Sequence, residues 1–431
     1  MSSPPTDRLA YLAILFGLIY CGESTANDKR WQIHSDIDFF AFSEVVSINQ
    51  FAKDFKDDLV SGKTAFTHDK FEIGARYSNF DVSYIARFDY ITEFTEDTAF
   101  FHHSEKNLNP LPTNREYDLL LNVDRASAEG IKLGYSWAIN DSVSIDFAGI
   151  YYYNATNLQS GFAGASGDVE PINDELIAQF REVTDGLTTD NRNLSPLISL
   201  LSDVQLDIDI NYAYDDPKFG EKFYRKPVFV GDLNPVITGV NFSEPKGTGY
   251  SFHISINWQA TEKITVNAEL IDLGYIISWE NAPQSRARFS LNPALIDVIE
   301  VAQVFVDGGV VAPNEIIDRH VFVEIFNADF DQHIPWRADL NAAWLLDLQP
   351  NLFGWTPQVS MLGGYYHTNV KDFPRLGIGL NETLQVFYDF GGEAIHVKYT
   401  GKYGFAKIIA DRFDSKKAHT LGIALGINIK F

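Results

Sequence analysis

The sequence predicts an all-β protein, a transmembrane antiparallel β-barrel of about 14 strands with 12 to 16 allowed. Three observations predict this fold: apolar and polar residues alternate along many segments, aromatic residues make up 14% of the chain, and the mean hydropathy is only −0.12. A helical membrane protein would need about 20 consecutive apolar residues for each span. A barrel carries its apolar residues at every second position, so it keeps a low mean hydropathy.

The last thirteen residues show the alternation most clearly. One face of this segment is apolar, and the other carries small and polar residues such as Thr420, Gly422 and Asn428. A wall with lipid on one side and water on the other fits both faces, whereas the alternative is an edge strand of a soluble β-sandwich. The terminal Phe431 resembles the C-terminal signal that outer-membrane barrels present to the barrel assembly machinery. The apolar face consists of Leu421, Ile423, Leu425, Ile427, Ile429 and Phe431.

The amino terminus predicts export. Leu9 to Tyr20 is an uncharged apolar run, it follows Arg8, and Ser24-Thr25-Ala26 supplies small residues for signal-peptidase cleavage. We therefore expect residues 1–26 to be a signal peptide and residues 27–431 to be the barrel. A lipoprotein anchor on Cys21 is the alternative, but the bulky Tyr20 disfavours it. Cleavage after residue 26 would remove the only cysteine, so no disulfide is expected.

The charge of the chain narrows the partners. A formal net charge of −24 argues against nucleic-acid binding, which needs clustered Lys and Arg. The expected location is the outer membrane of a Gram-negative bacterium. The expected partners are outer-membrane lipid, the assembly machinery and a small-molecule solute, with the oligomeric state left open.

Alternation recurs through the predicted barrel. Connecting turns are indicated at Asn140-Asp141, at residues 260–262 and at Gly391-Gly392. An even number of strands is expected of a bacterial barrel, so a count of fifteen candidate segments implies one error. The candidates are residues 31–39, 71–77, 80–90, 117–123, 131–139, 143–153, 204–212, 250–258, 264–279, 338–346, 358–367, 376–388, 395–399, 405–410 and 419–431.

The polar faces of these strands predict the lumen. In Asp203 to Tyr212 three carboxylates share one face, and carboxylates cannot point into hydrocarbon without a cost of several kcal/mol. The predicted lumen-lining residues are Asp36, Asp38, Asp203, Asp207, Asp209 and Glu269. Aromatic girdles are expected at strand ends, from Tyr151, Tyr152, Tyr153, Trp258, Trp279, Trp344 and Tyr399.

Two stretches interrupt the β pattern, at about residues 154–202 and 281–335. Both contain helix-like apolar spacing, and Asn292-Pro293 is typical of a helix start. These insertions are expected to fold into the lumen, to cap one mouth of the barrel or to bind a partner.

One hairpin carries a family resemblance. Residues 246–279 read KGTGYSFHISINWQATEKITVNAELIDLGYIISW and end in Asp272, Leu273, Gly274, Tyr275 and Trp279. This DLG-aromatic-x-x-x-W pattern resembles a functionally uncharacterised outer-membrane barrel family related to the FadL and PorV type. The resemblance implies a barrel of transporter type. The chain departs from FadL-type transporters by starting a strand at Trp31, where those proteins carry an N-terminal hatch.

Catalytic and metal sites are not expected. A phospholipase would need Ser and His together on the outer wall, and an omptin-like protease would need Asp and His pairs at the rim. His102-His103 and Asp215-Asp216 are interpreted as solvated loop residues. No spacing resembles a metal site, no cofactor is expected, and the protein is not predicted to be an enzyme.

Two function classes remain. A channel or transporter for small solutes, cation-preferring or hydrophobic, predicts a lumen lined by the inward carboxylates. A structural or assembly component of a cell-surface or secretion complex predicts a lumen plugged by side chains and insertions. The sequence favours the channel.

Overall fold

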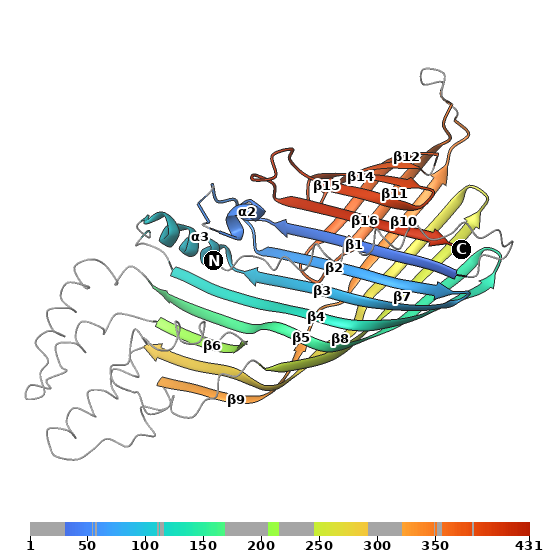
Figure 1. The fold of residues 1–431 in the computed structure, drawn as a ribbon. Helices are drawn as coiled ribbons and strands as arrows, with labels where there is room; N and C mark the ends of the chain where they lie inside the picture. Colours follow the sequence, from blue (N-terminus) through green and yellow to red (C-terminus); the bar gives the residue numbers. More distant parts are fainter. Residues whose placement is uncertain are drawn as a thin grey trace, which may run out of the picture.

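The computed structural model describes residues 31–53, 55–56, 58–109, 112, 116–168, 206–214, 245–291, 321–348, 350, 356–381 and 383–431. These residues form two short helices and sixteen strands (Figure 1). The elements are β1 (Trp31–Ser43), α2 (Ile48–Phe51), β2 (Thr64–Tyr77), β3 (Phe80–Phe94), α3 (Glu96–Asn107), β4 (Glu116–Asn140), β5 (Val143–Asp168), β6 (Leu206–Tyr214), β7 (Lys246–Thr261), β8 (Ile264–Leu291), β9 (Val321–His333), β10 (Arg337–Leu345), β11 (Val359–His367), β12 (Asp372–Leu380), β13 (Leu384–Asp389), β14 (Ala394–Gly401), β15 (Gly404–Ala410) and β16 (Thr420–Lys430).

Fourteen strands close into an antiparallel barrel, as the sequence predicts. Each strand from β1 to β5 and from β10 to β16 pairs with its neighbour in the chain, and β16 pairs with β1. The β5–β7, β7–β8 and β8–β10 pairings complete the ring. Closure leaves no unpaired edge within the ring, so every strand satisfies its backbone on both sides.

The two ends of the barrel differ in their connections. At one end, here called the turn end, five connections consist of two or three residues, among them 141–142, 262–263 and 402–403. At the opposite loop end the connections are mostly longer, and two of them contain α2 and α3. Short turns on one side and long loops on the other are typical of outer-membrane barrels.

The outward face of the ring is apolar. On β16 the outward residues Ile423, Leu425 and Ile427 are exposed, whereas inward Gly422 and Ala424 are covered. Exposed Trp and Tyr side chains lie in two belts, with aliphatic side chains between them. The turn-end belt contains Trp31, Tyr77, Tyr135, Trp137, Trp258, Trp344, Tyr399 and Tyr403, and the second belt contains Tyr151, Tyr153, Tyr250, Trp336, Tyr365 and Tyr388. Such belts fit the two interfaces of a bilayer.

The prediction of aromatic girdles is wrong for two of its residues. Tyr152 is 0% exposed and Trp279 is 1% exposed, so both point into the barrel. Tyr152 lies between outward Tyr151 and Tyr153, and strand alternation turns its ring to the opposite face.

One side of the barrel wall is much taller than the other. β4, β5 and β8 contain 25, 26 and 28 residues, whereas β11 to β15 contain six to nine. On the tall side β6 pairs with β5 and β8, and β9 pairs with β8, so the sheet extends past the ring (Figure 1).

The predicted bounds of the two insertions are wrong, because the strands of the tall side extend into both. β5 continues to Asp168, β8 continues to Leu291 and β9 begins at Val321, so parts of 154–202 and 281–335 are strand. Gly and Ser residues in β5 weaken its apolar alternation, which explains the error. The helix-like segments within 169–205 and 292–320 lie outside the described residues.

Two other strand assignments change. The candidates 117–123 and 131–139 are one strand, β4, with register shifts at Arg125/Ser127 and Glu129/Gly130. Conversely, candidate 376–388 is two strands, β12 and β13, which are joined at 381–383. The turns predicted at Asn140-Asp141 and Gly391-Gly392 are confirmed, and the turn predicted at 260–262 lies at 262–263, because β7 continues to Thr261.

α3 covers the edge of β4 beyond the end of β3. The Thr98 hydroxyl accepts from Leu120 N at 2.8 Å and donates to Leu120 O at 2.9 Å, and Asp97 Oδ2 accepts from Asp118 N at 3.0 Å. Thr95 caps the helix, because its side chain accepts from Thr98 N. No helix among the described residues has the length and apolar character to cross a membrane.

Candidate functional site in the barrel lumen

The lumen is polar because inward strand positions carry charged side chains. Lys70 Nζ lies 2.7 Å from Asp36 Oδ2, and Lys132 Nζ lies 2.6 Å from Glu72 Oε1. These pairs join β2 to β1 and β2 to β4. Opposite charges on adjacent strands and on strands one apart therefore neutralise each other along this wall.

A buried carboxylate holds two arginines together in the middle of the barrel. Asp272 is 2% exposed and accepts hydrogen bonds from Arg87, with Nη2 at 3.0 Å and Nη1 closer, and from Arg337 Nε at 3.0 Å. Arg87 comes from β3, Asp272 from β8 and Arg337 from the start of β10. This Asp272 network spans the lumen between strands that are distant in the chain. A buried charge needs such partners, because desolvation costs several kcal/mol per ion.

Further groups surround Arg87. Its Nη2 lies 3.0 Å from Asp89 Oδ1, and the same oxygen lies 2.9 Å from His68 Nδ1. Its Nη1 donates to the Tyr152 hydroxyl at 3.2 Å, and its guanidinium lies 4.7 Å from the centre of the Tyr275 ring. The arginine is thus fixed by hydrogen bonds and by an aromatic face together.

The backbone of β8 is bent at the motif that the sequence singled out. Asp272 has φ +65° and Gly274 has φ +61°, and the β7–β8 register shifts on both sides of Phe252. In the same region β8 exchanges its neighbour β10 for β9. Irregularities of this kind turn a side chain to a new direction, and here the bend accompanies the inward carboxylate. Positive φ favours glycine at Gly274 and is tolerated by aspartate.

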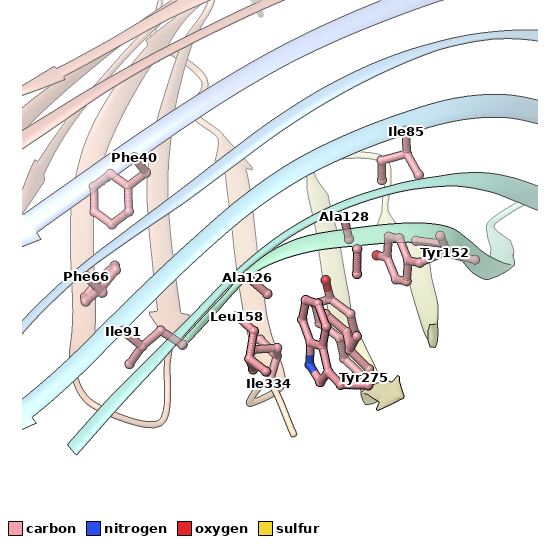
Figure 2. Close-up of a cluster of buried hydrophobic side chains, with 14 of the residues drawn as sticks. Phe40, Phe66, Ile85, Ile91, Ala126, Ala128, Tyr152, Leu158, Tyr275 and Ile334 are labelled. Carbon is pink, nitrogen blue, oxygen red and sulfur yellow. The ribbon is translucent and has the colours of Figure 1, made fainter. Parts of the chain in front are cut away.

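An apolar cluster fills the lumen on the loop side. Its residues come from ten strands, among them β1 to β5 and β8, and Figure 2 shows part of it. The Phe40 and Phe373 ring centroids are 5.6 Å apart, and Trp279 Nε1 donates to Gln332 Oε1 at 3.2 Å. The apolar cluster includes Phe40, Phe42, Phe66, Ile85, Ile91, Ala126, Ala128, Ile150, Tyr152, Leu158, Tyr275, Ile277, Trp279, Ile334, Phe373 and Ile409.

Two cavities lie in the lumen between the described strands. A cavity of about 890 Å³ reaches the turn end, where Asn140, Asp141 and Ser142 line it. A second cavity of about 380 Å³ lies against the Asp272 network. Six residues line both cavities and form what we call the neck: Glu269, Asp339, Arg375, His396, Lys398 and Lys407.

The predicted lumen residues fall into three groups. Asp36, Asp38 and Glu269 line the second cavity. Asp207 and Asp209 lie on β6 in the part of the sheet that extends past the ring, and Asp209 pairs with Arg288 at 3.7 Å. Asp203 lies outside the described residues.

The residues of the family motif do not all point into the lumen. Asp272, Tyr275 and Trp279 point inward, whereas Leu273 is half-buried on β8 opposite Phe252. Phe431 follows β16, and its backbone N donates to Trp31 O at 2.8 Å, which holds the end of the chain against β1.

Among the described residues, one cluster has the residue types of a metal site. Ligand atoms of His34, Glu72 and Asp81 lie within 4.8 Å of one another. Lys132 already pairs with Glu72, and Arg76 Nε lies 3.4 Å from Asp81 Oδ2. Because these cations neutralise the carboxylates, the cluster is better explained as part of the ion-pair network of the wall.

The inward basic residues were not predicted as site residues. Arg87 lies on the polar face of a predicted strand, so the alternation already places it in the lumen. Arg337, Arg375, Lys398 and Lys407 share that inward placement. Their partners could not be predicted, because Arg87 and Asp272 are 185 positions apart.

No protein-family model and no curated protein sequence matches the chain. Solved structures with a similar arrangement include a TodX deletion mutant, described as a monoaromatic hydrocarbon channel (10% identity, 94% of this chain and 91% of that chain, TM-score 0.35). A Pseudomonas aeruginosa FadL homologue shares 9% identity over 92% and 88% of the two chains, with TM-score 0.29. The Ralstonia pickettii toluene transporter TbuX shares 7% identity over 94% and 90%, with TM-score 0.27.

Proposed function

We propose that the protein is a FadL-like outer-membrane transporter for small solutes, whose lumen opens only when side chains move. The observation that carries the proposal is the lumen itself: two water-accessible cavities joined at the neck, within a closed ring that has an apolar outer band. Such an outer face suits lipid and such an interior suits solute. By the connection lengths, the loop end faces the cell exterior.

The closed state argues against a permanently open, cation-preferring pore. Three of the lumen carboxylates, Asp36, Asp272 and Asp339, are in ion pairs with Lys70, Arg87 and Arg375. Paired carboxylates attract cations far less than free ones. The apolar cluster also fills the loop side, so steady ion flow would require its displacement.

The lumen sets the expected size and character of the solute. Cavities of about 380 and 890 Å³ match the range of sites for small molecules. A solute entering from the loop end meets the apolar cluster first and the polar cavities afterwards. Small solutes with an apolar part therefore fit the path better than sugars or large peptides.

One observation favours a second candidate, a scaffold in a cell-surface complex. The Asp272 network and the apolar cluster interlock across the lumen, as a plugged structural barrel requires. A scaffold would expose its function on the loops and on the tall side of the wall.

Flux measurements on proteoliposomes separate the two candidates. The wild-type protein should admit a small amphipathic solute, and Phe66→Ala with Phe373→Ala should raise the rate severalfold, because both rings belong to the apolar cluster. Ile378→Ala, on the lipid face of β12, is the matched control and should leave the rate unchanged. No flux in wild type and in the double variant, with both folded, would support the scaffold instead.

A further inference from the structure

The neck has an acidic side and a basic side. Glu269 and Asp339 come from β8 and β10, whereas Lys398 and Lys407 come from β14 and β15. In the ring order β11, β12 and β13 stand between the two sides. The two lysines therefore face the acidic residues across the lumen.

The two lysines differ from the other basic residues of the lumen. Seven Lys and Arg side chains line the cavities, and five of them form ion pairs with a carboxylate. For Lys398 and Lys407, no carboxylate oxygen of the described residues lies within 4.0 Å of the ammonium group. Among the described residues that line the two cavities, the positive charge without a carboxylate within 4.0 Å is thus concentrated at these two lysines.

The lysines are also direct neighbours. Lys398 stands opposite Lys407 in the β14–β15 register, and Gln385 stands opposite Lys398 on β13. Like charges in directly opposite positions destabilise a sheet. A further neighbour, Phe405, places its ring 5.3 Å from Lys398 Nζ, which supports the ammonium group without neutralising it.

We infer that Lys398 and Lys407 form an anion-binding site at the neck, which receives the carboxylate or phosphate group of a small solute. The inference rests on the proposed transport function and adds the charge of the solute. An anion between the two ammonium groups removes their mutual repulsion, and rings of Lys and Arg select anions in other pores. Gln385 can donate a further hydrogen bond through its amide.

Glu269 limits the site to one bound anion. Its carboxylate faces the lysines across the neck, and the basic group nearest to it among the described ion pairs is His253 Nε2, at 3.9 Å. A single anion bound beside the lysines lies away from the Glu269 carboxylate, whereas a second anion would be repelled by that carboxylate. The site therefore takes one anionic group at a time.

Calorimetry on the purified full-length protein tests the site with benzoate, inorganic phosphate and neutral benzamide as probes. Wild type should bind benzoate or phosphate saturably and benzamide much more weakly. Lys398→Gln with Lys407→Gln should weaken anion binding at least about tenfold. Lys398→Arg with Lys407→Arg should retain the binding. Comparing benzoate with phosphate decides which anionic group the site prefers.

Lys402→Gln is the matched control, because Lys402 lies in the exposed turn between β14 and β15. It removes a positive charge from the same hairpin outside the lumen and should leave binding unchanged. Equal anion binding by wild type and the double Gln variant, or no anion binding by folded wild type, would overturn the inference. Heat-modifiable migration on gels confirms folding, and the single Lys407→Gln variant replaces the double one if that does not fold.

The site and the transport proposal fail in different ways. Flux of neutral benzamide without any anion binding would contradict the anion-binding site and still support transport. Saturable benzoate binding that is lost in the double Gln variant, without flux of any solute, would keep the site and remove transport.

Discussion

The loop half and the turn half of the lumen bury charge in different ways. In the loop half Arg87 and Arg337 share Asp272 beneath a cluster of aromatic and aliphatic side chains. In the turn half the wall opens into a cavity of about 890 Å³. Lys398 and Lys407 face it, and no carboxylate of the described part of the chain lies within 4.0 Å of either ammonium group. The comparison teaches that the same ring of strands supports a region whose charged groups pair with one another and a wider region with charge left for a solute.

The largest expected effect comes from removing the carboxylate of the loop half. Asp272→Ala leaves two arginines buried without their shared partner, which should lower the free energy of unfolding by about 3–5 kcal/mol. Urea unfolding in detergent, followed by tryptophan fluorescence, measures this.

Glu269→Ala is the counterpart in the turn half. Its side chain is 35% exposed and His253 Nε2 is 3.9 Å away, so the change should cost less than about 1 kcal/mol. Equal losses of unfolding free energy in Asp272→Ala and Glu269→Ala would contradict the difference between the two halves.

The next effect concerns the two faces of one short strand. Val386 points to lipid on β13, and Gln385 lines the turn-end cavity. Val386→Arg should cost about 2–4 kcal/mol in a bilayer, because a charge near the midplane must be desolvated, whereas Gln385→Asn should stay within about 0.5 kcal/mol. Unfolding from lipid vesicles measures both values. A larger loss of unfolding free energy in Gln385→Asn than in Val386→Arg would mean that Gln385, and not Val386, points to lipid.

A smaller effect is expected on the tall side. Ile208 lies on β6, which pairs with residues 159–167 of β5, well past the belt residues Tyr151 and Tyr153. Ile208→Arg should therefore cost only about 0–1 kcal/mol, as at or outside the interface. The same unfolding assay applies, and a loss as large as that of Val386→Arg would place β6 at membrane depth.

The smallest effect on folded stability is expected at the end of the chain. Phe431 lies on the lipid side of the turn end, and deleting it removes one exposed ring. If the terminal aromatic is the assembly signal, the deletion should lower the fraction of heat-modifiable protein in outer membranes while purified protein keeps its stability. Unchanged abundance in the membrane would argue against a signal.

The alternation of the sequence predicted most of the ring. Leu421 to Phe431 and Trp31 to Phe39 follow a period of two, and the structure places their apolar members on one outward face. The number of strands could be predicted because each crossing of the bilayer needs its own alternating segment. The division at 381–383 could not, since the apolar alternation passes from Leu380 to Leu384 with only a three-residue turn between.

The lumen could be predicted only in part. Strand phase places Asp36 and Asp38 inside, but it carries no information on which residue stands across the barrel. The pairing of Asp272 with Arg87 depends on ring closure and on a local bend of β8 at positive φ. The sequence resemblance singled out Asp272 without giving its partner, and the lysine pair depends on the register between β14 and β15.

The covering of β4 by α3 has a consequence for how copies of the protein behave next to one another. Where the tall side leaves the ring, β4 would present bare amide and carbonyl groups in water, which is a template for strand addition by another chain. The hydroxyl of Thr98 and the carboxylate of Asp97 occupy those groups at Leu120 and Asp118. The twelve residues of α3 thus leave this part of the edge without free backbone groups to which a second copy could add a strand.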